Sequence, residues 1–547
     1  MLDHARPSDH DEGWQPAPRG CLDGRRRQAP VSRRQVLAAG AGVGGALLVA
    51  AGARRTVARV NTVFPGGQDQ HDGMETGDQP TIIPWEPADL VEPEVRRAVD
   101  GVLTTELRAR YGYHDIGGYR LFTRGYEETN PGPTLRLQPG DTLRLNLIND
   151  LPPDRDTTPL NTDQPHKLNT TNFHFHGAHV SPSGISDNIF RQMEPGQSNA
   201  VEITLPADHP RGTYWYHPHH HGGADIQIAS GMAGAIVIEG DFADVPEIAA
   251  ATERVLVLGE VVFDAARTVE AFESLWSEVA TRFVAVNGQR EPVIRLRPGE
   301  VQRWRIVHTG YQNDLLLGLA GHALHAIAAD GVGFAGIERT NTLLMAPGQR
   351  ADILIQGGAP GTYALSAFPH DQGYPSPTGP LATVVVAGEP LPMDLPTALP
   401  SSPFAAIADA ELTGSRRLVF SARGPENDAA GYWQEFDFLV DGRLFDPDRV
   451  DQRVTLGAVE EWTIVNEHVH DHVFHIHVNP CQVTAVNGEA LAVGAPVWRD
   501  TMIVPGNGSL VFRTRFLDFT GRYVLHCHMM NHEELGMMQV VEVVAGA

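Results

Sequence analysis

Four short clusters of histidine contain the side chains best suited to bind metal ions. In sequence order they are His174-Phe175-His176, His217-Pro218-His219, His472-Val473-Phe474-His475-Ile476-His477 and His526-Cys527-His528, and the last is followed by His532 and Met537. Successive side chains on a β-strand point to opposite faces, so histidines at positions i and i+2 face the same way. Each His-x-His pair can therefore bridge two neighbouring metal ions.

The same alternation separates Cys527 from the histidines on either side of it. Cys527 must face away from His526 and His528 if this segment is a strand. His472 precedes His475 by three residues, so it faces away from His475 and can join Cys527 in a second site. One strand is therefore expected to connect two metal sites.

A thiolate, two imidazoles and a thioether form the ligand set of a blue-copper electron-transfer centre, in which methionine is the weak axial ligand. Here these ligands are His472, Cys527, His532 and Met537. The eight other histidines of the clusters suit three further copper ions, because a zinc site would not need so many paired ligands. Isolated His-x-His pairs arise by chance among 25 histidines, but four clusters in this order do not. The clusters therefore predict a redox metal that reacts with dioxygen.

Two sequence patterns recur three times and indicate which elements position these clusters. The first is a turn with glycine followed by an alternating strand, at residues 139–149, 298–308 and 456–466. The second is a strand that starts with glycine and carries an aromatic residue, at Gly212, Gly361 and Gly521. We therefore expect three copies of one β-sandwich, built from short alternating strands.

The second pattern also indicates which copies bind metal. Five and seven positions after its glycine lie, in copy order, His217 and His219, Ser366 and Phe368, and His526 and His528. The middle copy is therefore expected to lack metal ligands and to act as a spacer. Ligands of the first and third copies must then meet across an interface.

The four clusters, in this order across three repeats, resemble those of the multicopper oxidases, which include laccases, bilirubin oxidases and bacterial cuproxidases. The resemblance covers about residues 90–547 and implies an all-β fold of three cupredoxin-like Greek-key β-sandwich or barrel domains, at 91–240, 241–390 and 391–547. It implies four copper ions. By the family pattern, type 1 copper takes His472, Cys527, His532 and Met537, type 2 copper takes His174 and His475, and the type 3 pair takes His176, His217, His219, His477, His526 and His528.

The resemblance also implies proton donors, because dioxygen reduction consumes protons that the copper ligands cannot supply. Asp187, after the first cluster, and Glu533, directly after His532, resemble acidic residues with this role in the family. The alternatives are a turn-forming aspartate and a solvated glutamate.

Several residues near the clusters are not expected to bind copper. His179, His220, His221, His468 and His470 are expected to support the ligands or to lie at the surface, but His470 would compete with His472 if the strand register slipped. Cys481 is expected to be buried and inert, without a disulfide, because Cys527 is committed to metal and Cys21 precedes the export signal.

The N-terminal region resembles a twin-arginine export signal. The stretch from Ser32 to Leu37 contains Arg33-Arg34 and precedes an apolar run rich in Ala and Gly, from Ala38 to Ala53. Residues 1–60 are therefore expected to direct export by the twin-arginine machinery to the periplasm or the extracellular space, and residues 61–90 to form a linker. No stable membrane span is expected in the mature chain, and cleavage of the signal stays open.

The charge of the chain bears on its partners. Residues 1–60 carry ten Arg and five acidic residues, so without them the formal net charge of −25 becomes about −30. Nucleic acid is therefore not expected as a partner.

The resemblance implies an oxidase that takes electrons from a small reducing substrate, near an exposed edge of His472 or His532, and passes them to dioxygen. Phenols and aromatic amines are the preferred substrates, since the chain has no Met-rich insert of the kind that binds cuprous ions. The alternatives are a metallo-oxidase of Cu(I), Fe(II) or Mn(II), an exported cell-division protein of this fold without catalytic copper, and a copper nitrite reductase. The last would lack the paired histidines of a type 3 site.

Overall fold

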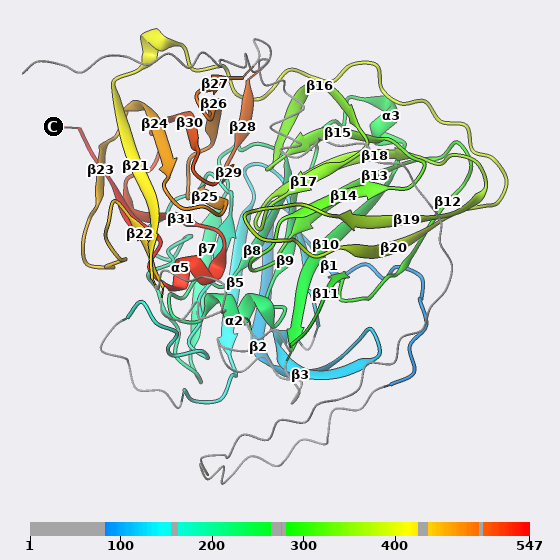
Figure 1. Ribbon diagram of the computed structural model, residues 1–547, viewed down its shortest axis with the longest axis horizontal. Coiled ribbons are helices and arrows are strands. Elements are labelled where there is room, and N and C mark those ends of the chain that lie inside the picture. Colours follow the sequence, from blue (N-terminus) through cyan, green and yellow to red (C-terminus); the bar gives the residue numbers. More distant parts are fainter. Residues whose placement is uncertain are drawn as a thin grey trace, which may run out of the picture.

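Three groups of strands follow one another along the chain and pack together as three domains (Figure 1). The computed structural model describes residues 83–127, 129–154, 162–263, 275, 280–424, 436–491 and 496–546. The expected export signal and most of the expected linker at 61–90 lie outside these ranges. In the view of Figure 1 the third domain lies on the left, the second on the right, and the first between and below them.

Domain 1 is built from two sheets and one short helix. Its elements are β1 (Val95–Arg97), β2 (Val102–Ile116), β3 (Tyr119–Tyr126), β4 (Thr134–Leu137), β5 (Thr142–Asn149), β6 (His174–His176), β7 (Ser198–Thr204), β8 (Gly212–His217), α2 (Ala224–Ala229) and β9 (Gly234–Ile238). The sheet orders are β1-β4-β9-β8-β6 and β3-β2-β5-β7. Leu143, Leu145 and Leu147 of β5 are buried and alternate with exposed residues, so they face the core between the sheets.

Domain 2 repeats this design with more strands. Its elements are α3 (Pro246–Ala249), β10 (Thr252–Phe263), β11 (Thr281–Val286), β12 (Val293–Leu296), β13 (Val301–His308), β14 (Leu315–Leu319), β15 (Leu324–Ala329), β16 (Val332–Thr340), β17 (Leu343–Met345), β18 (Arg350–Gln356), β19 (Gly361–Phe368) and β20 (Gly379–Val386). The sheet orders are β11-β10-β13-β18-β15-β16 and β12-β20-β19-β14-β17. Every residue of β13 is buried, because one face of this strand packs in the core of domain 2 and β8 of domain 1 contacts the other face.

Domain 3 ends the chain. Its elements are η1 (Asp409–Glu411), β21 (Gly414–Arg423), β22 (Asp437–Val440), β23 (Gln452–Thr455), β24 (Val459–Asn466), β25 (His472–Ile476), β26 (Cys481–Val486), β27 (Glu489–Ala490), β28 (Val497–Arg499), β29 (Thr501–Val504), β30 (Ser509–Arg515), β31 (Gly521–Cys527), α5 (Met530–Glu534) and β32 (Met538–Val544). One sheet has the order β22-β21-β24-β30-β26-β27, with β28 paired to β26, and the other has the order β23-β32-β31-β25-β29.

The same strand pairings occur in all three domains. The strand after the glycine turn runs parallel to the first long strand of its domain, in β2 with β5, β10 with β13 and β21 with β24. The last strand of each domain is also paired in parallel, in β4 with β9, β12 with β20 and β23 with β32. The expected threefold repeat of a cupredoxin-like β-fold is therefore confirmed. The domain limits 91–240, 241–390 and 391–547 stay predictions.

Side chains from all three domains pack together in one buried apolar cluster. This cluster contains Trp215 of domain 1, Val257 of domain 2 and Phe474 of domain 3. Helix α2 of domain 1 also lies against α5 of domain 3 (Figure 1). Because close-packed side chains resist displacement, this contact holds the first and third domains in one relative position.

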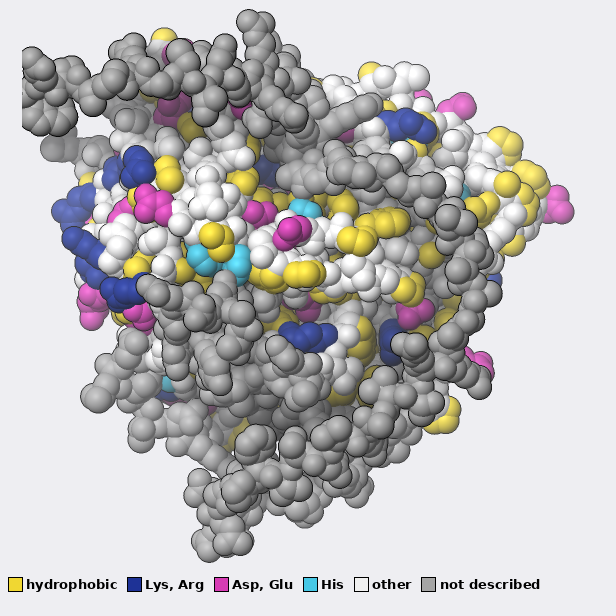
Figure 2. Space-filling view, in the orientation of Figure 1, with side chains coloured by type: hydrophobic (Ala, Val, Ile, Leu, Met, Phe, Trp, Pro, Cys, Tyr) yellow, Lys and Arg dark blue, Asp and Glu magenta, His cyan; other side chains and the backbone are white. Residues whose placement is uncertain are grey.

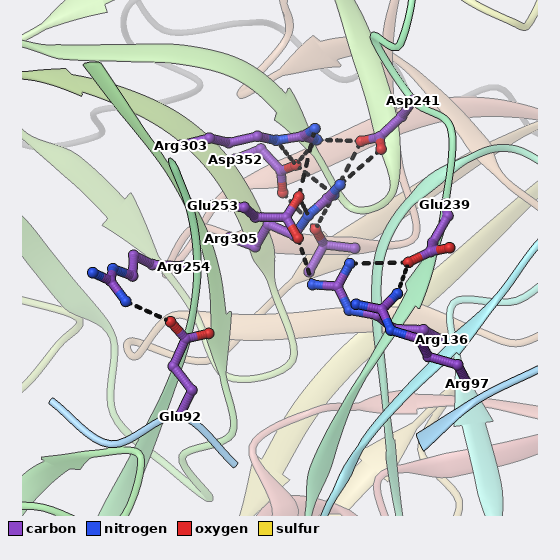
Figure 3. Close-up of polar contacts among 11 residues, drawn as sticks. Glu92, Arg97, Arg136, Glu239, Asp241, Glu253, Arg254, Arg303, Arg305 and Asp352 are labelled. Carbon is purple, nitrogen blue, oxygen red and sulfur yellow. Dashed lines mark hydrogen bonds and ion pairs between the residues drawn. The ribbon is translucent and has the colours of Figure 1, made fainter. Parts of the chain in front are cut away.

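A network of ion pairs surrounds Arg305 of β13, at the boundary between domain 2 and domain 1 (Figure 3). Arg305 Nη2 lies 2.8 Å from Asp241 Oδ1, and its Nε lies 2.6 Å from Glu253 Oε2. Its Nη1 lies 2.9 Å from Asp352 Oδ2, whose other oxygen accepts a hydrogen bond from Thr213 of β8 at 2.6 Å. Since each buried charge has an opposite charge beside it, this network tolerates burial and ties domain 1 to domain 2.

The expected boundary near residue 390 is an extended segment. Residues 387–408 contain no helix or strand, and the Leu391 N–H donates to Pro298 O at 2.9 Å, so the segment lies along domain 2. No helix among the described residues is long and apolar enough to cross a membrane.

Acidic and basic side chains are interspersed over the described part of domain 3 in Figure 2. Arg453 and Glu542 lie 2.8 Å apart, as do Arg515 and Glu411. These four exposed or partly exposed side chains of domain 3 are therefore in ion pairs.

Candidate metal centre

Strands of domain 1 and domain 3 bring eight of the expected histidines together. In domain 1, β6 pairs with β8 so that His174 lies opposite His217, and in domain 3, β25 pairs with β31 so that His475 lies opposite His526. Contacts then cross the domain interface. His219 Nε2 lies 3.2 Å from His526 Nε2. The predicted meeting of the first and third copies is confirmed.

The ring nitrogens fall into overlapping groups of three, within which ligand atoms lie no more than 4.8 Å apart. These groups are His174, His176 and His475; His176, His217 and His528; and His219, His477 and His526. All eight side chains are at most 2% exposed. All three groups contain potential ligands from both domains, so each can be completed only when the domains pack.

This arrangement fits a cluster of metal ions. Burial lowers the pKa of His174 and of His528 well below the ordinary value, so the imidazoles are neutral and their lone pairs are available. Nε2 of His174 and Nε2 of His475 are buried without a hydrogen-bond partner. Unpaired buried nitrogen is costly, and a bound cation would remove that cost. Imidazole is a ligand that copper accepts readily.

A further group, separate from these three, contains His472, Cys527 and His532. Cys527 Sγ lies 3.5 Å from His472 Nδ1 and 3.7 Å from His532 Nδ1. Burial raises the pKa of Cys527 to about 12, so its thiolate needs a bound cation to form near neutral pH. Met537 is buried, and its backbone carbonyl accepts the Cys527 N–H at 3.0 Å. The predicted separation of Cys527 from its flanking histidines is confirmed.

The expected exposed edge of His472 or His532 is not present. The two side chains are 0% and 1% exposed. Phe438 stacks on His532 with ring centroids 3.9 Å apart, and its ring centroid lies 6.1 Å from that of His472. An electron must therefore enter this group through other protein atoms.

The additional histidines lie outside these groups in the described part of the chain. His468 lies beside His472, with ring centroids 5.3 Å apart, but it is His472 and not His470 that lies with Cys527. The register of β25 is therefore the one in which His472, and not His470, faces Cys527. Cys481 is buried and free, as is Cys527.

Asp187 contacts a potential ligand of the first group, His174. Its Oδ2 lies 3.1 Å from His174 Nδ1, and its Oδ1 accepts the Phe175 N–H at 2.9 Å. Burial raises the pKa of Asp187 to about 8, although the Phe175 hydrogen bond acts in the opposite direction. The carboxyl group therefore orients His174 and can hold a proton near neutral pH.

Glu533 lies between two histidines that come from different domains. Its Oε2 is 2.9 Å from His526 Nδ1, and its Oε1 is 3.3 Å from His219 Nδ1. Burial opposes its ionisation, but His526 and His219 outweigh burial and lower the pKa of Glu533 to about 2. Since Glu533 is 0% exposed, the alternative of a solvated glutamate is wrong.

The sequence reasoning missed a buried ion pair beside the histidines. Arg350, at the start of β18 in domain 2, has Nη1 2.7 Å from Asp500 Oδ1. Asp500 O lies 2.9 Å from His475 Nδ1, and Thr501 Oγ1 lies 3.0 Å from His176 Nε2. The middle domain is therefore more than a spacer, because its arginine holds the loop that contacts two potential ligands. No local pattern marks a partner 150 residues away.

Comparison with known proteins places these groups in a family. Sequence models described as multicopper oxidase match residues 116–242, 253–389 and 420–547. The multicopper oxidase mco of Staphylococcus haemolyticus is 25% identical over 435 residues, which cover 77% of this chain and 84% of that protein. The laccase of Bacillus subtilis is 23% identical over 483 residues, which cover 79% of this chain and 91% of that protein.

A solved structure supports the same fold. The multicopper oxidase of Campylobacter jejuni, described as a metallo-oxidase, superimposes with a TM-score of 0.70 at 23% sequence identity and covers 86% of this chain and 98% of that one. The family matches together span most of the chain, and the buried histidine groups fit copper. The chain therefore belongs to the multicopper oxidase family and is an oxidoreductase.

Proposed function

We propose that this enzyme takes electrons one at a time from a phenol or aromatic amine and uses four of them, with four protons, to reduce dioxygen to two waters. The observation that carries this proposal is the position of one strand. The end of β31 and the residue after it put Cys527 in one group of potential ligands and its neighbours His526 and His528 in the other groups. A few covalent bonds therefore separate a site for electron uptake from a site with room for several metal ions.

The proposed copper assignment follows the family pattern. Type 1 copper is held by His472, Cys527, His532 and Met537, type 2 copper by His174 and His475, and the type 3 pair by His176, His217, His219, His477, His526 and His528. Support comes from the geometry, since the six type 3 residues form two separate groups of three. When bound, copper supplies one-electron redox chemistry and the reaction with dioxygen.

The protein positions these groups and supplies protons. Arg350 and Asp500 hold the loop against His475, and Asp187 orients His174. We assign proton supply to Asp187, which is buried against His174 and can hold a proton near neutral pH. Glu533 is buried against His526 but is ionised near neutral pH, so we propose that it passes protons on rather than storing them.

A cavity supports an aromatic reductant. It has a volume of about 670 Å³, and its walls include Phe283, Tyr311 and Tyr374. The ring of Tyr374 lies 5.2 Å from the ring of His470, and the carbonyl of Tyr311 accepts the N–H of Met530 at the start of α5. Aromatic walls favour planar apolar substrates, and these two contacts connect the cavity to the elements that hold the type 1 group.

The test is steady-state oxygen uptake by the copper-loaded enzyme with phenols, aromatic diamines and the ions Cu(I), Fe(II) and Mn(II). Uptake with phenols and diamines, with four electrons consumed for each dioxygen, is expected. Uptake with metal ions alone would favour the metallo-oxidase alternative, and no uptake with any reductant would favour a non-catalytic protein of this fold. We also propose export by the twin-arginine machinery, supported by the sequence around Arg33-Arg34.

Met537→Leu is expected to retain type 1 copper and to raise its reduction potential, because the weak axial donor that stabilises Cu(II) is lost. A redox titration of the blue absorption measures this change. Met530→Leu is the control, since Met530 is equally buried but is not a proposed ligand. An unchanged or lower potential in Met537→Leu would show that Met537 is not the axial ligand.

A further inference from the structure

Arg290 lies in the wall of the cavity that also contains Phe283, Tyr311 and Tyr374. It is located between β11 and β12 of domain 2. Its guanidinium carbon lies 5.2 Å from the ring centroid of Phe283, over the face of the ring. A guanidinium is attracted to an aromatic face and keeps its charge in that position. An aromatic molecule in the cavity therefore has a cationic group beside it.

Contacts with three segments of the chain hold the Arg290 side chain in place. Besides Phe283, its guanidinium carbon lies 5.4 Å from the ring centroid of Trp85. Its aliphatic part passes over Gly117, in the turn between β2 and β3 of domain 1, where an added Cβ would lie 2.7 Å from Arg290 Cβ and Cδ. A residue without a side chain is needed there. The guanidinium is therefore positioned before a ligand arrives, and such preorganisation lowers the cost of binding.

The hydrogen-bonding capacity of Arg290 is unused. Its Nε lies 3.6 Å from Glu291 Oε1, too far for a hydrogen bond, and its side chain forms no hydrogen bond within the part of the chain that the structure describes. The planar guanidinium has five N–H donors in a fork that matches the two oxygens of a carboxylate. Arg290 is therefore suited to bind an anionic group at the cavity wall.

Two other charged side chains of the same wall are engaged within the protein. Arg282 Nη1 donates to the hydroxyl of Tyr311 at 2.5 Å. Glu260 accepts the Gln312 N–H on Oε2 at 2.9 Å and the side-chain N–H of Asn313 on Oε1 at 2.5 Å. A charged group on a substrate would therefore meet fewer competing contacts at the unbonded guanidinium than at these two side chains.

We propose that Arg290 binds a carboxylate of the reducing substrate, so that the preferred phenols are those with a carboxylate on the ring or on a short side chain. This inference rests on the proposed function, because the phenol must be oxidised from this cavity. Paired hydrogen bonds between a guanidinium and a carboxylate are strong, and the aromatic walls hold the ring. The carboxylate is not changed in the reaction, in which four phenols and one dioxygen give four phenoxyl radicals and two waters.

Equilibrium dialysis of p-methoxycinnamate with the copper-loaded enzyme tests the site without turnover, because a methyl ether replaces the oxidisable phenol. One molecule is expected to bind per chain, at least tenfold more weakly in Arg290→Gln, since the charge and the fork are lost. Glu291→Gln is expected to bind it at least twofold more tightly, because a competing carboxylate is removed, and it decides the question if Arg290→Gln does not fold.

Arg297→Gln is the matched control for this binding experiment. Its Nε also lies 3.6 Å from a glutamate oxygen, Glu300 Oε2, but Arg297 is not part of the cavity wall. The control is expected to keep the full affinity. Affinity for p-methoxycinnamate that is absent, or equal in all of these proteins, would overturn the site.

Steady-state oxygen uptake with ferulate and with its methyl ester tests selection among substrates, since the two share one phenol ring and differ in the carboxylate. The KM for ferulate is expected to be at least tenfold below that for the ester, and to rise to near the ester value in Arg290→Gln. The kcat for both compounds and the KM for the ester are expected to stay unchanged, because only binding of the carboxylate is lost.

The outcomes separate this inference from the proposed function. An equal KM for ferulate and its ester in the wild-type enzyme would overturn selection by the carboxylate, while uptake with both would still support the oxidation of phenols. Uptake with neither compound, together with binding of p-methoxycinnamate that depends on Arg290, would contradict the proposed function and leave the anion site standing.

Discussion

Cys527→Ser is expected to remove the intense blue absorption of the copper-loaded enzyme and all of its turnover. Only a thiolate gives that charge-transfer band, and a serine hydroxyl does not replace it as a ligand. Cys527 is also the residue that lies in the group with His472 and His532 while its neighbours lie in the other groups. Its removal therefore interrupts the shortest route from electron uptake to dioxygen.

The absorption spectrum and oxygen uptake with a phenol measure this effect. Cys481→Ser is the matched control, because Cys481 is equally buried, but its Sγ lies 3.7 Å from the Asn479 carbonyl and belongs to none of the groups of potential metal ligands. The control is expected to stay blue and active. A Cys527→Ser protein that is still blue would end the type 1 assignment.

Asp187→Asn is expected to slow reoxidation of the reduced enzyme by dioxygen at least tenfold. Asparagine keeps the acceptor for the Phe175 N–H but cannot store or release a proton. A general acid or base of this kind contributes roughly 10²–10⁴-fold to a rate, so a tenfold loss is a conservative expectation. Reduction of type 1 copper by substrate is expected to stay nearly unchanged, because Asp187 lies against His174 and not against the Cys527 group.

Stopped-flow measurement of the two half-reactions separates these effects. Asp518→Asn is the control, since it removes a carboxylate that contacts His179, at 2.9 Å, rather than a proposed ligand. The control is expected to show wild-type rates in both half-reactions. Equal slowing of reduction and reoxidation in Asp187→Asn, or of neither, would refute the proton-donor role.

Most of the fold could be predicted from short-range patterns. Glycine turns and alternating strands recur three times, and β5, β13 and β24 begin directly after those turns. The metal ligands followed from strand parity, which is why Cys527 could be separated from His526 before any contact was known. Such inferences succeed because side-chain direction on a strand depends only on neighbouring residues.

Burial was the property that local patterns could not supply. His472 and His532 were expected to have an exposed edge, yet both are buried and Phe438 packs against both rings. From the sequence, Glu533 was equally consistent with a proton donor and with a solvated residue. Only the packing of domain 1 on domain 3 places it between His219 and His526.

The sequence by itself determined the class of chemistry, because a thiolate, imidazoles and a distant methionine at strand spacing are local features with few other uses. Only the tertiary structure decided which histidines share a group and that Arg350 of the middle domain supports the loop at Asp500. Arg350 and Asp500 are 150 residues apart in the sequence. Their existence depends on how three domains pack, and domain packing is a sum over many distant contacts that no short stretch of sequence contains.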